Sequence, residues 1–366
     1  MPAHTSTAEI LLRGSDPLGP TIGFFTALGF RVRTILPADH PTKVRLEGHG
    51  LRLVLDSTAD LPSGHVVLRS DTEEPRTLTA PNGTLVTIEP ATPRVDIPAI
   101  HQEFVLTRAE SGDAFGEGRA GMQYRDLIPS RLGGAYIASN ILIPTGGEVP
   151  DYVHYHHVKF QMIYCHRGWV KVLYEDQGEM ITMHPGDCVL QPPTIRHRVC
   201  EASDGMEVVE IGCPAVHETW ADPDTVLPTG RTLPERGYGE VGHRFVFHVA
   251  EGSPWTPWSP DGRVQDGWEC RDTGIAGATD GMAEVCTVRP TDESSRVDMT
   301  HTGEFSFLFV RDGEVTLERD GTGASTGTST GTEVLRSGDS VNIPPGLSVT
   351  LRAPSRDLVL LHTFLP

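Results

Sequence analysis

The sequence has few basic residues relative to acidic ones and no long apolar run. Lysine and arginine number 30 against 49 aspartates and glutamates, which gives a formal net charge of −19. Nucleic acids and anionic membrane surfaces are bound by clustered lysine and arginine, so this charge argues against both as partners. The chain has no run of about 18 apolar residues and does not open with a charged and then apolar leader. We therefore expect a cytoplasmic protein that does not bind membranes and whose partner is a small molecule.

Aromatic residues are also scarce, at 7% of the chain, whereas glycine (39) and proline (29) are frequent. This composition is typical of a turn-rich β protein and argues against a helical bundle. The six cysteines lack C-x-x-C spacing, which favours reduced thiols over a disulfide framework. With 366 residues, the chain has room for about two to three domains.

The first 95 residues have the pattern of a small α+β module. A strand-like run at residues 9–13 precedes turn residues and a short helix that ends at Gly29. The order is βαβββ with one extra edge strand. The later strands are predicted around residues 44–46, 51–55, 65–68 and 85–88.

This order, with the segments 24–30 (FFTALGF) and 80–84 (APNGT), resembles one module of the vicinal oxygen chelate (glyoxalase-like) family. The resemblance implies metal ligands on the first strand and four residues after the glycine of the last turn. Here the first strand has no histidine or glutamine, and the residue four positions after Gly83 is Thr87. The family also pairs two modules to form a site, and this chain has one. We therefore expect a structural or packing module without chemistry of its own.

Between residues 96 and 225, short strand candidates follow one another, separated by Gly, Pro or Asp turns. Eight such strands are what a jelly roll or small β-barrel needs. They lie at residues 136–143, 153–157, 161–166, 169–174, 180–183, 187–191, 196–200 and 207–211.

Seven of the 16 histidines fall between His154 and His217, and they are densest in residues 153–161 (VHYHHVKFQ). Side chains at i and i+2 of a strand project to the same face, so His154 and His156 can meet in a pocket. Two neutral imidazoles that meet there indicate a metal site. On these two residues alone, a histidine-rich surface loop is an equal alternative.

Two longer spacings decide between these alternatives. The segment that starts at His154 has the pattern H-x-H-x4-Q-x6-G, and Gly186 opens a second pattern, G-x5-P-x4-H, that ends at His197. Together they resemble the two motifs of the cupin superfamily, because both spacings agree at once. The resemblance implies that His154, His156, Gln161 and His197 surround one divalent metal ion inside the barrel.

Many metal-binding cupins carry glutamate where Gln161 stands, and an amide contributes an oxygen without a charge. Three imidazoles and one amide leave the charge of a divalent ion uncompensated by its ligands, which strengthens the ion as a Lewis acid and stabilises reduced iron. The resemblance favours Fe²⁺, with manganese, nickel or zinc as alternatives. It implies an oxidoreductase, a non-haem iron dioxygenase acting on a small organic acid or a phenolic or enolic substrate. A redox-neutral isomerase, cyclase or lyase and a non-catalytic metabolite-binding protein are the alternatives.

The sequence does not assign the catalytic acid or base. Strand alternation from Gln161 directs Ile163 and Cys165 inward and Tyr164 outward. The faces of the other candidates are not fixed by one sequence. The candidates on nearby strands are Tyr164, His166, Arg196 and Glu210.

The second half of the chain repeats the first. Gly168 corresponds to Gly313 at an offset of 145, and Gly186 corresponds to Gly338 at 152, with the extra residues in the Gly/Ser/Thr-rich segment 321–331. In this alignment the four ligand positions become Met299, His301, Ser306 and Val349.

One imidazole of four cannot make an ordinary metal site, so the second barrel is predicted to be metal-free. It is expected to pack on the first barrel, cover its mouth or mediate dimerisation, which leaves a homodimer open. The sequence thus predicts a mainly β chain of three units. These are an α+β module at residues 1–95, a metal-binding cupin jelly-roll barrel at 96–225 and a degenerate cupin barrel at 226–366.

Overall fold

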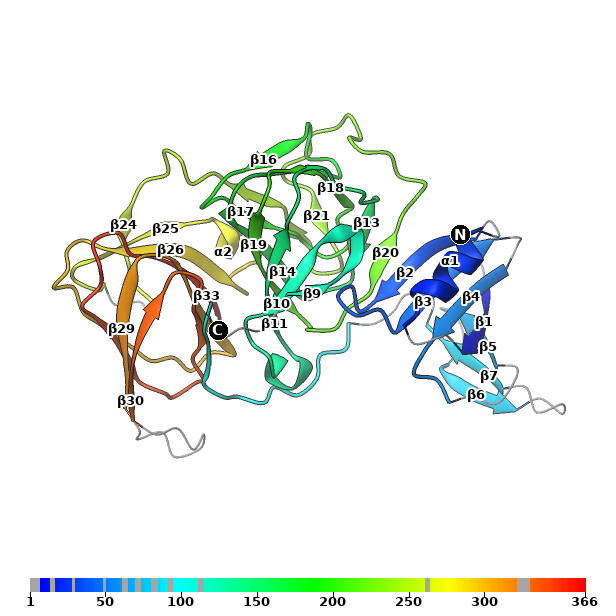
Figure 1. The fold of residues 1–366 in the computed structure, drawn as a ribbon, viewed down its shortest axis with the longest axis horizontal. Coiled ribbons are helices and arrows are strands. Elements are labelled where there is room, and N and C mark those ends of the chain that lie inside the picture. The colour runs from blue at the N-terminus through cyan, green and yellow to red at the C-terminus, as the bar shows by residue number, and fades with distance from the viewer. Residues whose placement is uncertain are drawn as a thin grey trace.

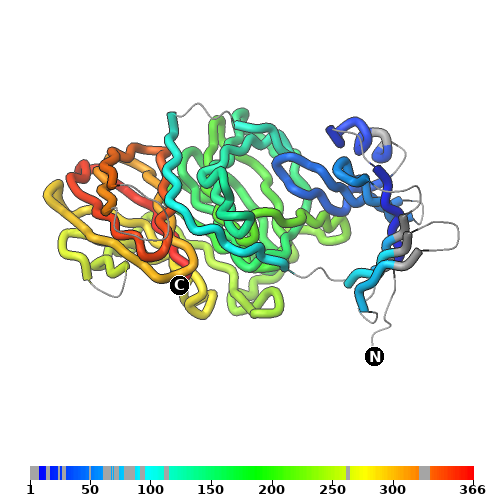
Figure 2. Tube along the Cα trace, turned by 90° about the horizontal axis from the view of Figure 1, so that it is seen from below, coloured from blue at the N-terminus to red at the C-terminus, as the bar shows by residue number. Residues whose placement is uncertain are grey.

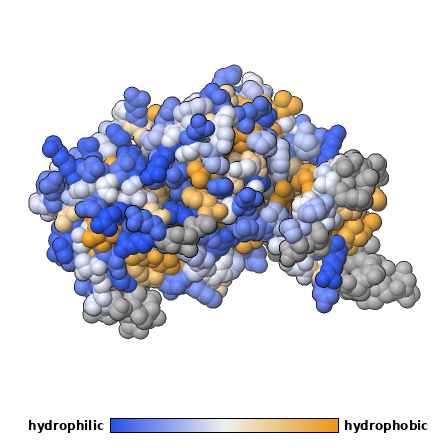
Figure 3. Space-filling view, in the orientation of Figure 1, coloured by the Kyte–Doolittle hydropathy of each residue, from blue (hydrophilic) through white to orange (hydrophobic). Residues whose placement is uncertain are grey.

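The protein is mainly β, as predicted, and forms two barrels and an N-terminal module that lie in a row (Figure 1). No helix in the described part of the chain is long and apolar enough to cross a membrane. Hydrophilic residues cover most of the face shown in Figure 3, with smaller apolar patches between them. The computed structural model describes residues 7–13, 17–27, 30–48, 51–60, 65–69, 74–79, 85–90, 95–110, 115–260, 264–320 and 330–366.

The N-terminal module begins as a βαβββ unit in which β1 and β4 pair in parallel. Its core is a small apolar cluster that includes Leu18, Val44 and Leu46. The unit consists of β1 (Thr7–Arg13), α1 (Gly19–Ala27), β2 (Arg31–Leu36), β3 (Lys43–Gly48) and β4 (Leu51–Asp56). The sheet order is β2-β3-β4-β1, and it continues through β5 (His65–Arg69), β7 (Leu85–Glu89) and β6 (Arg76–Thr79).

Two strands of this module, β2 and β6, were not predicted. The one buried position of β2 (RVRTIL) is the polar Thr34, and its register shifts between Val32 and Thr34, so the strand lacks a regular apolar alternation. The turn at residues 80–84 lies outside the described residues. The likeness of the module to the glyoxalase-like family therefore stays a prediction.

The first barrel is a sandwich of two antiparallel sheets that contains all eight strands predicted between residues 136 and 211. One sheet has the order β23-β17-β14-β19-β11-β10-β9, and the other runs β16-β15-β18-β13-β20, with β12 on β18. The first sheet consists of β9 (Gly116–Glu117), β10 (Gln123–Asp126), β11 (Ile137–Ile143), β14 (Phe160–Arg167), β17 (Cys188–Leu190), β19 (Met206–Cys213) and β23 (Val246–His248). The second consists of β12 (Gly147–Glu148), β13 (His154–His156), β15 (Val170–Tyr174), β16 (Ile181–Met183), β18 (His197–Ala202) and β20 (Thr219–Ala221).

The second barrel repeats this arrangement with the sheets β24-β25-β26-β33-β28-β31-β8 and β27-β32-β29-β30. Its strands are β8 (Val105–Thr107), β24 (Thr256–Pro257), β25 (Trp268–Asp272), β26 (Glu284–Pro290), β27 (Val297–Met299), β28 (Phe305–Asp312), β29 (Glu314–Arg319), β30 (Gly331–Arg336), β31 (Ser340–Asn342), β32 (Val349–Arg352) and β33 (Val359–Leu365). The remaining elements are η1 (Arg119–Gly121), η2 (Arg131–Gly134), β21 (Gly237–Tyr238), β22 (His243–Arg244) and α2 (Ile275–Ala278).

The two barrels exchange a strand. Strand β8 precedes the first barrel in the chain but pairs with β31 of the second, and β23 precedes the second barrel but pairs with β17 of the first. Each exchanged segment is held by an aspartate, since the Ala109 amide donates to Asp339 and the Ala250 amide donates to Asp187, both at 2.8 Å. The proposed boundaries after residues 95 and 225 therefore separate units whose sheets interlock.

The N-terminal module is continuous with the first barrel. Strand β2 pairs with β20, with Thr34 opposite Trp220, so that one sheet runs through both units. The blue hairpin formed by β2 and β3 reaches the green first barrel in Figure 2. The sheet that carries the predicted ligands is thus extended by strands from the start of the chain.

Candidate metal centre

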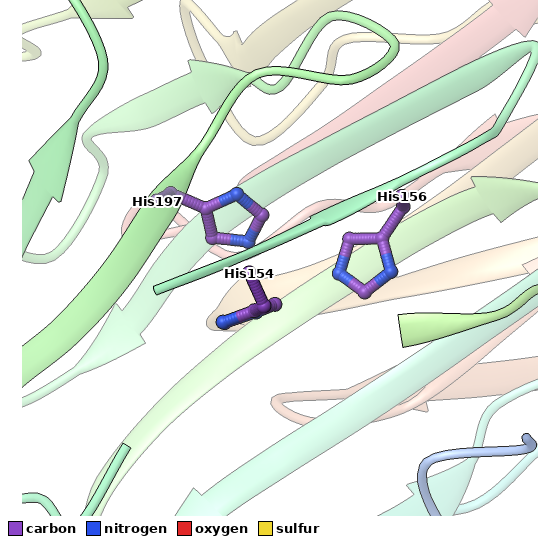
Figure 4. A group of neighbouring side chains, drawn as sticks. All are labelled: His154, His156 and His197. Carbon is purple, nitrogen blue, oxygen red and sulfur yellow. The ribbon is translucent and has the colours of Figure 1, made fainter. Parts of the chain in front are cut away.

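Three of the predicted ligands, His154, His156 and His197, converge inside the first barrel (Figure 4). His154 on β13 lies opposite His197 on β18, and strand alternation brings His156 to the same face. All three side chains are buried, and one ring nitrogen from each lies within 4.8 Å of the others. This is the only such group of three or more His, Cys, Asp or Glu residues within the described ranges.

The hydrogen bonds of the three rings determine which nitrogen can bind a metal. In each ring Nδ1 donates to a backbone carbonyl oxygen, at 2.7 Å for His154, 3.1 Å for His156 and 3.0 Å for His197. A carbonyl oxygen only accepts, so Nδ1 carries the proton and Nε2 keeps its lone pair. This is the tautomer that a metal-binding histidine needs.

Burial keeps these imidazoles neutral. It lowers the pKa of His154 and His156 well below the usual range, with further lowering by the neighbouring charges of Arg119 and His217, respectively. Burial also lowers the pKa of His197 to about 4. Neutral, oriented imidazoles in a shared cavity fit a divalent metal ion.

Gln161 lies on β14 in the facing sheet, in the wall of the same cavity. Its Nε2 donates to Glu210 Oε1 at 2.6 Å. A carboxylate without a proton can only accept, so Glu210 fixes the amide with nitrogen toward itself and leaves Gln161 Oε1 free. The amide therefore offers an oxygen donor, and its place as a fourth metal ligand stays a prediction.

A buried ion pair lies beside His154. Arg119 on η1 pairs with Asp151, and its Nη2 lies 2.6 Å from His154 Nε2. Burial opposes the charge of Arg119, but Asp151 outweighs it and raises the pKa of the guanidinium above its usual value. The cavity thus contains a permanent positive charge, and Arg119 must move off His154 Nε2 before a metal ion can bind there.

The cavity is polar at the histidine end and apolar at the other. Tyr174 lies opposite His197, and the next inward-facing pair along the same strands is Val172 and Val199. The volume open to the centre of a water molecule is about 120 Å³. The apolar end is lined by Ile141, Ile143, Val170, Val172, Met183, Val199, Met206 and Val208.

The structure resolves the faces that the sequence left open. Ile163 lines the cavity and Cys165 is buried in the apolar cluster of this barrel, whereas Tyr164 points into the core shared with the second barrel, as strand alternation predicted. Of the acid–base candidates, only Glu210 lines the cavity. The ring of His166 packs 4.9 Å from Phe309 of the second barrel.

Arg196 pairs with Asp222 and lies over the Tyr155 ring outside the cavity. His157 packs on Trp220, also outside the cavity lining. Neither residue is therefore placed to act on a molecule bound beside the histidines.

Sequence reasoning missed six polar residues of the cavity. They are Asp39, Arg119, Tyr124, Tyr174, Gln191 and His217. The His217 ring lies 5.0 Å from that of His156, edge to face, and its Nδ1 donates to the Pro214 carbonyl at 3.0 Å. His217 belongs to the same histidine-rich stretch, but it follows both motifs, so no spacing singled it out.

The equivalent part of the second barrel has a different chemistry. His301 Nε2, the nitrogen a ligand would use, lies 2.7 Å from the Ile343 carbonyl and is committed to it. The cavity here is about 10 Å³ and is lined in part by Met299, Ser306 and His362. Among its described residues, this barrel offers neither the donors nor the room of the first.

Comparisons with known proteins agree with this architecture. Residues 140–212, which include all four predicted ligands, match the family described as Cupin domain. These residues form a cupin domain. The matched segment spans β11 to β19, so the barrel that holds the histidines is the one that the family describes.

Solved structures match over a larger part of the chain. The crystal structure of protein Ylba from E. coli has a TM-score of 0.50 and 11% identity, over 75% of this chain and 94% of that one. Oxalate decarboxylase from Bacillus subtilis at pH 4.6 has a TM-score of 0.49 and 13% identity, over 75% of this chain and 78% of that one. At such identities the likeness concerns the fold alone. No curated protein matches the chain.

Proposed function

We propose that this protein is a mononuclear metal-dependent enzyme that acts on a small organic acid, with its site in the cupin domain. The observation that carries the proposal is the set of three buried, neutral imidazoles that direct Nε2 lone pairs into one cavity. His154, His156 and His197 would hold the ion, and Gln161 would supply an amide oxygen. Imidazole and amide donors suit iron, manganese, nickel and zinc, of which Fe²⁺ is the ion favoured by the sequence.

A divalent ion in this position would polarise a carbonyl or carboxylate oxygen of the substrate. The four donors are uncharged, but the carboxylate of Glu210 lies directly behind Gln161. Glu210 therefore supplies part of the negative charge that the ligands lack, and holds the amide in the orientation that binds metal.

The cavity favours a small acid with an apolar portion. Arg119 provides a positive charge at the histidine end, where a carboxylate of the substrate would bind. The opposite end is lined by aliphatic side chains and methionines. A volume of about 120 Å³ corresponds to roughly ten water-sized positions, which limits the substrate to a small molecule.

Redox-neutral chemistry, such as elimination or isomerisation, has the better support for the reaction. Glu210 and His217 place a carboxylate and an imidazole in the cavity next to the proposed ligands, and such groups can accept or donate a proton of the substrate. Proton transfer beside a Lewis acid is the chemistry of metal-dependent lyases and isomerases.

A non-haem iron dioxygenase, the reaction first expected from the sequence, is the second candidate. Its support is the uncharged ligand set together with the mostly apolar cavity. Neither the matched family nor the similar structures described above name an oxygenase.

Two measurements test the proposal. Elemental analysis of protein purified without chelators should find about one metal ion per chain, and a metal-free protein that takes up no added metal would contradict it. Mass spectrometry of co-purified ligand then identifies substrate candidates. With the iron-loaded protein, turnover without oxygen uptake would support the redox-neutral reaction, whereas stoichiometric oxygen uptake would support the dioxygenase. Tight binding without turnover would identify a metabolite-binding protein.

A further inference from the structure

The turn between β2 and β3 of the N-terminal module lies at the cavity. Pro37, Ala38 and Asp39 line it, together with Ala215 and His217 of the first barrel. The predicted role of the module as a packing surface does not account for this position, because a packing module has no need to reach the cavity that contains the histidines.

The turn is held against the barrel by an ion pair. Asp39 accepts a hydrogen bond of 2.8 Å from Arg131, which also binds Asp126 at 3.1 Å. Burial alone would raise the pKa of Asp39, but the hydrogen bond and charge of Arg131 lower it below its usual range. Asp39 therefore stays ionised at neutral pH, and the turn keeps its attachment to the barrel.

The module also contacts the support of a proposed ligand. Arg45 on β3 pairs with Glu218 at 2.5 Å, and its guanidinium lies 5.1 Å above the Trp220 ring. The backbone carbonyl of the same Glu218 accepts the 3.1 Å hydrogen bond of His156 Nδ1. A segment that orients His156 is thus held in place from the N-terminal module.

We propose that the N-terminal module forms one wall of the substrate entrance and that Ala38 and Asp39 select small carboxylic acids by size. The proposal rests on the proposed function for the identity of the site, but the wall itself follows from the cavity lining and the ion pair. The small side chain of Ala38 leaves the entrance open, and the Asp39–Arg131 pair fixes its width.

The first test needs no metal. Diethyl pyrocarbonate modifies the free Nε2 of histidine, and His217 lies half-buried among the residues of the entrance. In the metal-free full-length chain, Ala38→Trp should slow the modification of His217 severalfold, measured by peptide mass spectrometry, and Asp39→Ala should accelerate it. A matched control is Thr77→Trp on β6, at the far edge of the same sheet, which should leave the rate unchanged.

The second test uses the metal-loaded chain. Removal of the ion by the bulky chelator 1,10-phenanthroline should slow in Ala38→Trp. In cobalt-substituted Ala38→Trp, a higher benzoate concentration than in the cobalt-substituted wild type should be needed to produce the absorption change. The corresponding increase in the acetate concentration should be smaller.

Equal rates of His217 modification in the wild type, Ala38→Trp and Asp39→Ala would overturn the entrance proposal, whether or not metal binds. Failure to bind metal would instead overturn the proposed function, while the His217 measurement still decides on the entrance. Slower modification without any difference between benzoate and acetate would overturn selection by size.

Discussion

In the first barrel His154 lies opposite His197 across two neighbouring strands, and in the second barrel Met299 lies opposite Val349 at the same register. The backbone around these positions also agrees. In the first barrel the Thr194 amide, in the turn after β17, donates a 2.8 Å hydrogen bond to the His156 carbonyl. In the second barrel the Gly346 amide, in the turn after β31, donates the same 2.8 Å hydrogen bond to the His301 carbonyl. The two barrels therefore share one scaffold and differ in the side chains that face the cavity.

The difference extends beyond the four ligand positions. Glu210 lies opposite Ile163, and His362 lies opposite Leu308 at the corresponding step of the second barrel. Gln161 bonds Glu210 at 2.6 Å, while Ser306 lies 3.5 Å from His362. The second barrel keeps the same scaffold without histidine at the positions of His154 and His197 and without a carboxylate at that of Glu210. The scaffold therefore does not require these three residues, and their presence in the first barrel points to chemistry.

Loss of a proposed ligand should have the largest effect. His156→Ala or His197→Ala should lower metal affinity by more than about 100-fold, because removing a ligand costs more than removing the groups that orient it. Metal content after gel filtration measures this loss, and circular dichroism checks that the barrel stays folded. The matched change His301→Ala in the second barrel should leave metal content unchanged. Equal losses from both barrels would abolish the distinction between them.

Removal of the carboxylate behind Gln161 should have a smaller effect. In Glu210→Gln the new side chain can donate as well as accept a hydrogen bond, so it no longer fixes the Gln161 amide oxygen toward the ion. The substitution also removes the negative charge of Glu210. We expect metal affinity to fall by about tenfold, measured by competition with a chelator of known affinity. His362→Gln at the matching position should not change it. Wild-type affinity in Glu210→Gln would show that Glu210 does not prepare Gln161 for metal binding.

Removal of the aspartate that holds each exchanged strand should lower stability in both barrels, because each aspartate accepts a matching pair of backbone hydrogen bonds. Asp339 differs from Asp187 in that it also pairs with Arg108 at 2.8 Å. Asp187 accepts hydrogen bonds from the amides of His184 and Ala250, and Asp339 accepts them from those of Arg336 and Ala109. Asp187→Ala and Asp339→Ala should each lower the free energy of unfolding by about 2 kcal/mol, measured in urea. A loss in only one barrel would show that the exchange stabilises the two unequally.

The smallest effect concerns pH. Burial lowers the pKa of His362 to about 4, whereas in the unfolded chain it is about 6.5. The unfolded state therefore binds more protons below pH 6.5, and the folded state loses stability as pH falls. Between pH 6.5 and 5.5 this histidine should account for about 1 kcal/mol of that loss. In metal-free His362→Gln, the fall in the free energy of unfolding between pH 6.5 and 5.5, measured by urea denaturation, should be smaller by this amount. The same fall as in the wild type would contradict the burial of a neutral imidazole.

Much of the first barrel could be predicted from the sequence. Its eight strands are marked by turns, and the inward direction of Ile163 follows from strand period alone. The alignment of the halves also predicted that Met299 and Val349 replace His154 and His197, which the strand register confirms. These features are local or repeat at fixed spacing, so one sequence contains them.

The prediction was weakest where the decisive partner is distant in sequence. Strand β2 was missed because its buried position is the polar Thr34 and its register is irregular, yet it joins the N-terminal module to β20. The pairs Arg45–Glu218 and Arg131–Asp39 link segments more than ninety residues apart. No spacing rule connects such residues, since only the packed sheets bring them together.

The sequence by itself determined that the chain is mainly β, that it contains a repeated barrel, and which barrel kept three histidines and a glutamine at metal-binding spacing. Only the tertiary structure decided which nitrogen of each ring keeps its lone pair, that Glu210 orients Gln161, that Arg119 lies in the cavity beside His154, and that Pro37, Ala38 and Asp39 line the same cavity. The physical reason is that strand period and turn residues act over a few positions. Hydrogen-bond geometry, burial and charge in the cavity depend on which strands lie next to each other after folding.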